Sequence, residues 1–266
     1  MGSVATITLY ADSSDQAQRA FVAAFSRIAQ LNRILSDYDP DSELSRACKE
    51  KRVASPELTA VITHAQKLAA ETGGAFDITA GPLIGLWRNA RKSKKMPTEA
   101  EIAAARTLSG YGNLEIENGV LRCSIAGMRL DAGGIAKGYA ADEALAAIRN
   151  TDVASALVAV SGDIAIGDAP PGKPGWQVKI LDEVRVLSNC AVSTSGDEFQ
   201  FVDIDGVRYS HVIDPRTGIA LRHSRTVAVI ARRGIDADAI ATAVSVGGPE
   251  VMEDLRVRYK AEILLQ

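Results

Sequence analysis

One stretch of the chain, residues 130–142 (LDAGGIAKGYAAD), constrains the fold more than any other. It joins an apolar strand end to an Ala-rich helix through two adjacent glycines. Adjacent glycines let backbone N–H groups approach a ligand without interference from a Cβ atom. The helix start adds unpaired N–H donors and the positive end of the helix dipole, and Lys137 adds a cation. These features indicate either a phosphate-binding turn or an ordinary strand-to-helix turn with a surface lysine. Neither a Walker A loop nor a GxGxxG fingerprint is present.

The order of the predicted elements favours an α+β fold. Hydrophobic periodicity and turn signals predict a strand at 4–10, helices at 17–35, 55–72 and from 98, a hairpin around Asn118-Gly119, a helix at 135–149, strands at 156–160, 176–180, 199–204, 207–213 and 226–231, a helix at 237–246, and a last helix and strand. This order lacks the regular strand–helix alternation of a parallel sheet. We therefore expect mainly antiparallel sheets with flanking helices. No linker-like stretch divides the chain, which predicts a single domain over residues 1–266.

Composition and charge exclude several classes of protein. The chain has 266 residues, of which 47% are hydrophobic and 24% charged, as in ordinary globular proteins. Its net charge of −3, with no basic cluster interleaved with aromatic residues, argues against nucleic-acid binding. The dense positive run at 88–95 (RNARKSKK) is interpreted as a solvated loop. No apolar run approaches the length of a membrane span.

The cysteines and the N-terminus bear on the cellular compartment. Cys48, Cys123 and Cys190 are odd in number, widely spaced and without a CxxC pair, so neither a disulfide framework nor a zinc site is expected. The N-terminus lacks a basic segment followed by an apolar one, which predicts a cytoplasmic protein as given. A periplasmic protein whose export segment had been removed would look the same.

Asp238 and Thr242 form a candidate metal site. On a helix they stand four residues apart, so their side chains share one face. A carboxylate with a hydroxyl is a poor zinc or copper set but suits Mg²⁺, which also keeps water and phosphate oxygens as ligands. The alternative is that Asp236 or Asp238 caps or charges the first turn of the helix.

His211 is the candidate proton acceptor. In an alternating strand Tyr209, His211 and Ile213 share one face, and the strand ends in an Asp-Pro-Arg-Thr-Gly turn. His211 could take a proton near neutral pH, or it could be a packed strand histidine. The hydroxyl-rich segment 193–197 (STSGD) is interpreted as a second turn that either binds phosphate or closes a hairpin.

Residues 73–87 place an acid and a hydroxyl, Asp77 and Thr79, between aromatic and apolar groups, with Gly81-Pro82 expected to force a turn. Three aromatic side chains of this part of the chain are candidates to flank a flat ring; the alternative is that they belong to the core. They are Tyr38, Phe76 and Trp87.

Taken together, these stretches resemble the ApbE family of FAD:protein FMN transferases over nearly the whole chain. The pieces, in family order, are MGS at 1–3, SDYDPDSELS from Ser36, GGAFDITAGPLIGLW from Gly73, LDAGGIAKGYAAD from Leu130, SGDIAIG from Ser161, STSGD from Ser193, YSHVIDPRTG from Tyr209 and DADAIAT from Asp236.

The resemblance implies a T-fold-like α+β domain that uses Mg²⁺ and FAD. Such an enzyme transfers FMN through its phosphate to a Thr or Ser hydroxyl of an acceptor flavoprotein and releases AMP. By resemblance, the Mg²⁺ ligands are Asp238, Thr242 and the carbonyl of Gly134, and His211 is catalytic. The implied flavin contacts are Met1, Tyr38, Ala75, Phe76, Asp77, Asp131, Lys137 and Ile213. Two alternatives remain open: a Mg²⁺-dependent FAD hydrolase that uses the same site, and a protein that carries FAD without cleaving it.

Overall fold

A six-stranded sheet is the largest element of the computed structural model, which describes residues 4–50, 53–196 and 200–266. Its strand order is β1-β4-β5-β8-β13-β14, and every neighbouring pair is antiparallel. The strands are β1 (Ala5–Leu9), β4 (Ala156–Val160), β5 (Asp163–Ile166), β8 (Cys190–Ser195), β13 (Val227–Ala231) and β14 (Glu262–Leu265). The predicted α+β class with mainly antiparallel sheets is confirmed.

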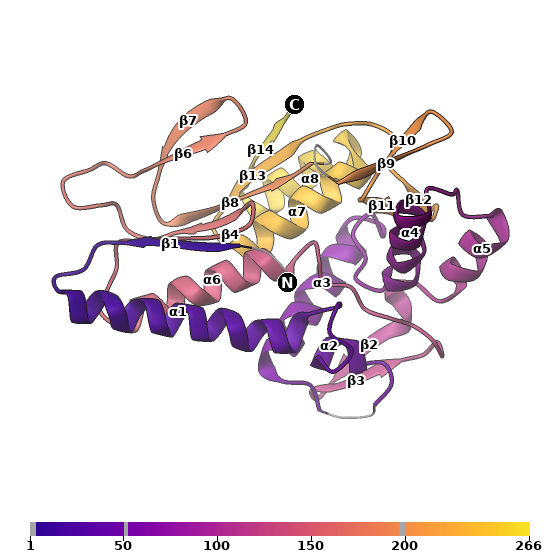
Figure 1. The fold of residues 1–266 in the computed structure, drawn as a ribbon, viewed down its shortest axis with the longest axis horizontal. Helices are drawn as coiled ribbons and strands as arrows, with labels where there is room; N and C mark the ends of the chain where they lie inside the picture. The colour runs from indigo at the N-terminus through magenta and orange to yellow at the C-terminus, as the bar shows by residue number, and fades with distance from the viewer. Residues whose placement is uncertain (1–3, 51–52, 197–199) are drawn as a thin grey trace.

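Both faces of this sheet are covered. Along β13, Val227 and Val229 pack into the cluster that holds the helices, whereas Ala228 packs toward the hairpin of β6 (Trp176–Ile180) and β7 (Glu183–Leu187). This alternation follows from successive side chains of a strand pointing to opposite faces. In Figure 1, α6 (Ala136–Arg149) and α7 (Gly234–Gly247) lie against one face. α1 (Ser14–Leu35) packs outside α6, and α8 (Pro249–Tyr259) follows α7.

The remaining elements lie at the right-hand end of the molecule in Figure 1, away from the β6–β7 hairpin. They are α2 (Glu43–Arg46), α3 (Pro56–Glu71), α4 (Gly81–Ser93), α5 (Glu99–Thr107), a short 3₁₀ helix (Tyr111–Asn113), the hairpin of β2 (Leu114–Glu117) and β3 (Val120–Cys123), the hairpin of β9 (Phe201–Ile204) and β10 (Val207–Ser210), and the pair β11 (Ile213–Asp214) and β12 (Ile219–Ala220). A separate apolar cluster joins α4 and α5 to these last four strands.

Local sequence signals explain where several of these elements begin. Ser55 caps α3 by accepting a hydrogen bond from the Leu58 N–H, with Pro56 at the first helical position. Thr98 and Glu101 form the predicted capping box of α5. Asn118 and Gly119 have positive φ values of 50° and 76°, as the tight turn between β2 and β3 requires.

Helix α7 is capped by another helix rather than by its own residues. Its N-cap residue, Arg233, makes no side-chain capping hydrogen bond. Instead, the Asp142 carboxylate of α6 accepts hydrogen bonds from the backbone N–H groups of Gly234 (2.7 Å) and Ile235 (3.0 Å). The helix therefore begins at Gly234, three residues before the predicted start at 237, because a distant carboxylate satisfies its exposed donors.

The prediction that the run at 88–95 is a loop is wrong. Gly81-Pro82 does not force a turn; Pro82 stands in the first turn of α4, which continues to Ser93. Leu83, Trp87 and Ala90 form the buried stripe of this helix at helical spacing. Most of the basic run therefore lies on a packed helix.

The expected turn at 193–197 and the long strand at 207–213 also differ from the structure. Ser193–Ser195 lie in the central strand β8, and Asp197 lies outside the described residues. The strand predicted at 207–213 is interrupted: β10 ends at Ser210, and β11 begins at Ile213. His211 therefore does not share one strand face with Tyr209 and Ile213. At the break, the backbone N–H groups of Ser210 and His211 donate hydrogen bonds to the carbonyls of Leu221 (2.8 Å) and Gln200 (2.9 Å), partners that local alternation does not report.

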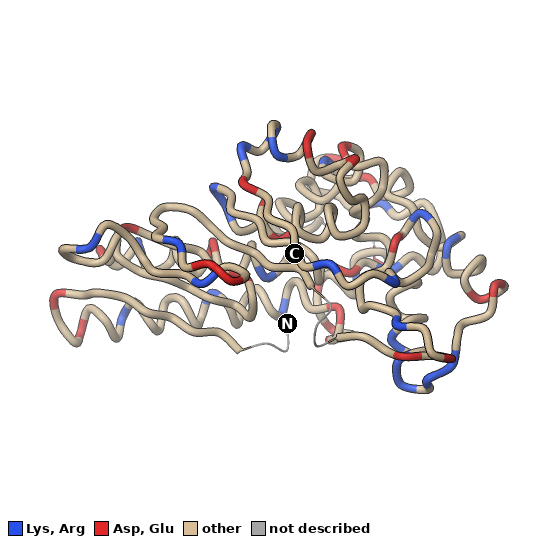
Figure 2. The backbone as a smooth tube through the Cα atoms, turned by 90° about the horizontal axis from the view of Figure 1, so that it is seen from above, with Lys and Arg blue, Asp and Glu red and all other residues tan. Residues whose placement is uncertain are grey.

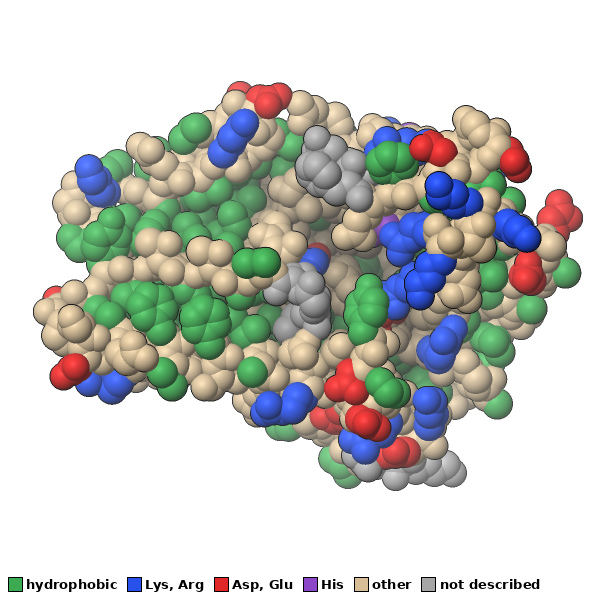
Figure 3. Space-filling view, in the orientation of Figure 1, with side chains coloured by type: hydrophobic (Ala, Val, Ile, Leu, Met, Phe, Trp, Pro, Cys, Tyr) green, Lys and Arg blue, Asp and Glu red, His purple; other side chains and the backbone are tan. Residues whose placement is uncertain are grey.

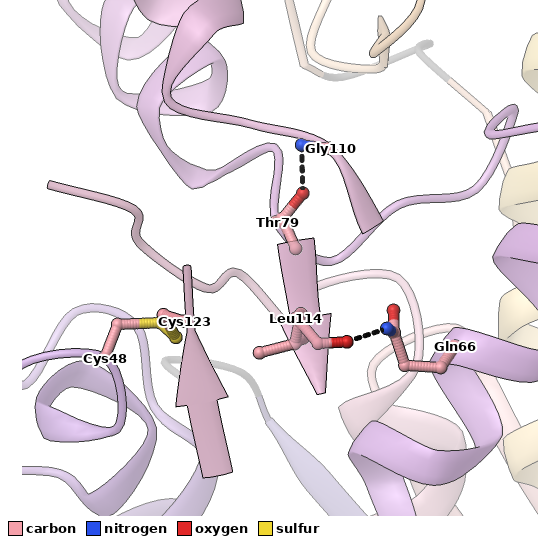
Figure 4. The surroundings of a disulfide bond; sticks show 6 residues. All are labelled: Cys48, Gln66, Thr79, Gly110, Leu114 and Cys123. Atoms are coloured by element: carbon pink, nitrogen blue, oxygen red, sulfur yellow. Dashed lines mark hydrogen bonds between the residues drawn. A yellow bond between two sulfur atoms is a disulfide. The ribbon is translucent and has the colours of Figure 1, made fainter. Parts of the chain in front are cut away.

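The expectation that the chain has no disulfide is wrong. Cys48, after α2, is bonded to Cys123 at the end of β3, with their Cα atoms 5.3 Å apart (Figure 4). The pair is separated by 75 residues, so sequence spacing gave no sign of it. The bond ties the α1–α2 region to the β2–β3 hairpin. Cys190 is the free cysteine.

We expect reduction of this disulfide to destabilise the protein. Because the bond closes a long loop, its loss should lower the free energy of unfolding by about 3 kcal/mol. Urea denaturation with and without dithiothreitol measures the difference, and Cys190→Ser is the matched control that should behave like wild type. An unchanged midpoint on reduction would contradict a stabilising role.

Candidate active site

The centre of the site is the ammonium of Lys137, at the start of α6, between two buried carboxylates. Its Nζ lies 2.8 Å from Asp163 Oδ2 and 3.2 Å from each carboxylate oxygen of Asp238. Asp238 also accepts a hydrogen bond from the Gly138 N–H (3.1 Å), and Asp163 accepts one from the Ser193 hydroxyl. The cluster thus joins α6, α7, β5 and β8.

The electrostatics of this cluster follow from its burial. Burial and the neighbouring Asp163 raise the pKa of Asp238 to about 6, while Lys137 acts in the opposite direction. The two carboxylates keep the pKa of Lys137 above its ordinary value despite burial. An ammonium between two carboxylates is thereby held in its charged form.

The segment that contains Gly133 and Gly134, called the glycine loop below, lies directly against Thr242. A Cβ atom built on Gly134 would come within 2.7 Å of Thr242 Oγ1, so the close approach requires glycine at this position. The Thr242 hydroxyl makes no hydrogen bond with the residues that the structure describes. Tertiary packing therefore brings together the three predicted Mg²⁺ ligands, Gly134, Asp238 and Thr242.

These three groups are chemically suited to Mg²⁺, since all would donate oxygen atoms. Only one of them is an acidic side chain. Accordingly, within residues 4–50, 53–196 and 200–266, no three His, Cys, Asp or Glu side chains gather into a metal-binding cluster. Asp236, the alternative candidate on this helix, pairs instead with Arg233 (2.9 Å) and with His64 Nε2 (3.1 Å).

Asp131 connects the glycine loop to a second group of predicted residues. Its carboxylate accepts a hydrogen bond from the Gly133 N–H (2.8 Å) and forms an ion pair with the Arg88 guanidinium (2.8 Å). Its backbone N–H donates to the carbonyl of Ile78 (2.8 Å). Burial and the nearby Asp37 raise the pKa of Asp131 to about 6, and Arg88 opposes this shift.

Asp77 and Thr79 hold the chain in place at this junction. Asp77 Oδ1 accepts from the N–H and hydroxyl of Thr79, and its Oδ2 accepts from the Tyr111 N–H (3.0 Å). The Thr79 hydroxyl accepts from the Gly110 N–H at 2.7 Å (Figure 4). Burial raises the pKa of Asp77 above its ordinary value. Both side chains are thus structural supports of the segment beside Asp131.

The predicted aromatic contacts differ in exposure. Phe76 and Trp87 are buried, as is Ala75, so the core interpretation holds for these two aromatic rings. Tyr38 is 69% exposed, and the Arg88 guanidinium lies 4.4 Å from its ring centroid. Of the three rings, only Tyr38 is available to a ligand.

His211 lies in the connection between β10 and β11, and Ile213 is the first residue of β11. His211 Nδ1 lies 3.2 Å from the carbonyl oxygen of Gln200. Because a carbonyl only accepts hydrogen bonds, this contact is a hydrogen bond when Nδ1 carries the proton. Ile213 is buried in the apolar cluster of α4. Met1, the remaining predicted contact, lies outside the described residues.

Sequence reasoning missed two residues of the site, which are Arg88 and Asp163. Arg88 contacts both Asp37 (2.5 Å) and Asp131, and so ties the loop that carries Tyr38 to the glycine loop. The helical spacing of Leu83, Trp87 and Ala90 could have placed Arg88 on a helix. The sequence offers no comparable signal that Asp163 would face Lys137.

The same burial effects predict a pH dependence of stability. Burial raises the pKa of Asp142, the cap of α7, to about 6, while its hydrogen bonds from Gly234 and Ile235 oppose the shift. Between pH about 4 and 6 the folded state therefore binds more protons than the unfolded state. The free energy of unfolding should fall as pH rises through this window, by about 3 kcal/mol for this group, and then level off.

Urea denaturation at a series of pH values tests this expectation. Asp142→Asn cannot ionise and should make the fall shallower, whereas Asp254→Asn, an exposed acid on α8, should leave it unchanged. An equal slope in wild type and Asp142→Asn would refute the assignment to Asp142.

Comparison with known proteins identifies the family. The family model described as the ApbE family matches residues 1–265. A FAD:protein FMN transferase of Vibrio cholerae is 30% identical over 239 residues, which cover 84% of this chain and 72% of the relative. The transferase of the same name from Salmonella typhimurium is 31% identical over 243 residues, covering 84% and 69%.

Solved structures show the same fold. Apo flavinyl transferase ApbE of Pseudomonas stutzeri has a TM-score of 0.86 and 30% identity, covering 99% of this chain and 87% of that one. Flavin transferase ApbE of Vibrio cholerae has a TM-score of 0.90 and 28% identity, covering 100% and 90%. The fold and site thus define a transferase. The chain belongs to the ApbE family.

Proposed function

We propose that this chain is an FAD:protein FMN transferase that moves FMN from FAD to a Thr or Ser hydroxyl of an acceptor flavoprotein and releases AMP. The observation that carries the proposal is the Lys137–Asp163–Asp238 cluster, packed against the glycine loop that precedes α6. The names of the relatives support the reaction, and we assign the phosphates to this cluster and the adjoining glycine loop. Asp131 and Tyr38 would contact the flavin nucleotide beside it, with further contacts from the backbone of residues 75–77.

We further propose that Mg²⁺ binds Asp238, Thr242 and the carbonyl of Gly134. Two features support this: the three groups are in contact or one helical turn apart, and the Thr242 hydroxyl has no hydrogen bond within the described part of the chain. Bound there, Mg²⁺ would offset the charge of the pyrophosphate and polarise its phosphorus–oxygen bonds.

The chain's own residues would carry the remaining chemistry. In the transfer, the acceptor hydroxyl oxygen bonds to the phosphorus of the FMN moiety, and the bond from that phosphorus to the oxygen of AMP breaks. We assign His211 the role of accepting or orienting the hydroxyl proton; the 3.2 Å contact between its Nδ1 and the Gln200 carbonyl would hold the ring in position for this role. Lys137 and the N–H groups at the start of α6 would face the developing negative charge.

Intact mass spectrometry tests the proposal. After incubation with FAD, Mg²⁺ and a threonine-containing acceptor peptide, the peptide should gain the mass of one FMN, AMP should appear, and EDTA should abolish both. AMP without labelled peptide would favour a hydrolase instead. Bound FAD with neither product would favour a carrier.

We also propose an oxidising compartment for the protein, in place of the cytoplasmic expectation. The Cys48–Cys123 disulfide supports this proposal, because reducing cytosol rarely preserves such bonds. Of the two compartments considered from the sequence, the periplasm fits better. Alkylation of acid-quenched cells of the source organism tests it: free thiols at Cys48 and Cys123 would refute it. Among the described residues, no helix combines the length and apolarity needed to cross a membrane.

A further inference from the structure

A basic surface pocket, separate from the Lys137 cluster, lies between α4 and α5. Its volume is about 890 Å³, and Arg88, Arg91, Lys92 and Arg129 all line it. The only acidic side chain in its lining is Glu101, whose carboxylate is occupied by the capping box of α5. The pocket therefore presents cations to any occupant.

Three of these cations have no ion-pair partner in the part of the chain that the structure describes. Arg91, Lys92 and Arg129 form no ion pair with the residues that the structure describes, whereas Arg88 is paired with Asp37 and Asp131. Burial and the adjacent Arg88 lower the pKa of Arg91. Such crowding of positive charge favours an anionic ligand over an empty pocket.

The positive charge also extends beyond the pocket. Lys94 and Lys95, both exposed, follow directly after the last residue of α4, Ser93. Figure 2 shows a denser group of basic residues at the end of the molecule that holds α4 and α5, and Figure 3 shows Lys and Arg side chains gathered over the same part of one face. This concentration stands out in a chain whose net charge is −3.

The pocket adjoins the proposed flavin site. Tyr38 lines it together with Arg88, and Arg88 reaches Asp131 beside the glycine loop. An occupant of the pocket would therefore lie next to a flavin nucleotide held by these residues. Under the proposed function, the phosphates of that nucleotide would bind elsewhere, at Lys137 and the glycine loop.

We propose that this pocket docks an acidic segment of the acceptor protein, placing its hydroxyl beside the flavin. The inference rests on the proposed transferase function, which requires a protein as second substrate. Charge complementarity favours an extended acidic polypeptide, because the cations run from the pocket to Lys94 and Lys95 after α4, a longer path than one phosphate group would need.

Peptide binding without FAD tests the proposal independently of catalysis. The probe is a fluorescent threonine peptide flanked by Asp and Glu residues, compared with a peptide in which Asn and Gln replace them. Fluorescence anisotropy should show that Arg91→Gln/Lys92→Gln weakens binding of the acidic peptide about tenfold and leaves the neutral peptide unaffected. The matched variant Lys94→Gln/Lys95→Gln loses the same charge outside the pocket lining and should have a smaller effect.

Two outcomes would overturn the proposal. If both double variants weakened peptide binding equally, the effect would come from the general positive charge around the end of α4 rather than from the pocket. Reduced FAD affinity in Arg91→Gln/Lys92→Gln, with peptide binding unchanged, would assign the pocket to the nucleotide. Because binding is measured without turnover, failure of the transferase reaction would be seen separately, in the mass assay above.

Discussion

Asp238→Asn is expected to reduce FMN transfer at least about a hundredfold, because the substitution removes the only carboxylate among the proposed Mg²⁺ ligands. Asparagine keeps the size of the side chain, but its amide bears no charge and would face the Lys137 ammonium, which lies 3.2 Å from both Asp238 oxygens. The residual transfer should no longer respond to EDTA. Intact mass of the acceptor peptide and AMP release measure the loss.

A neighbouring acid on the same helix provides the control. Asp236 pairs with Arg233 and His64 rather than with the glycine loop, so Asp236→Asn should retain transfer that EDTA abolishes. Urea denaturation should show that Asp238→Asn remains folded. Full, EDTA-sensitive transfer by Asp238→Asn would show that the metal assignment is wrong.

The second large effect is expected at the crossing of α6 and α7. A Cβ atom added at Gly138 would lie 2.0 Å from the carbonyl oxygen of Gly234 and 2.8 Å from Cβ of Asp238. Because backbone atoms cannot yield as a side-chain end can, Gly138→Ala must separate the two helices. We expect it to lower the free energy of unfolding by about 3 kcal/mol, and to displace Asp238 from Lys137.

Gly112→Ala is the matched control, because a Cβ atom there meets nothing within 4 Å and the backbone φ is not positive. It should unfold at the wild-type urea concentration and retain FMN transfer. If Gly138→Ala were equally stable, the close helix crossing would not be what positions the site.

Much of the fold was predictable from local sequence. The caps at Ser55 and Thr98 and the Asn118-Gly119 turn are confirmed, because each depends on residues within one turn of the chain. The α+β class and the ApbE family are confirmed as well. Of the residues that the family resemblance named, Asp238 lies against Lys137 and Thr242 lies against Gly134.

The errors share a physical cause, which is dependence on distant partners. The basic run at 88–95 was predicted to be a solvated loop, but its residues 88–93 belong to α4, which packs through Trp87. The Cys48–Cys123 bond joins positions 75 residues apart, and the strand is interrupted at His211, whose backbone N–H donates a hydrogen bond to the carbonyl of Gln200. None of these outcomes can be read from neighbouring residues.

The sequence by itself determined which chemical groups the chain carries and which local turns and helix starts it forms, since these depend on short-range sterics and hydrogen bonds. Only the tertiary structure decided that Asp163 would face Lys137, that Asp142 would cap α7, and that Arg88 would join Asp37 to Asp131. Each of these contacts pairs buried charges or donors from separate elements. Burial makes such groups costly when unpaired, so the packed fold as a whole selects their partners.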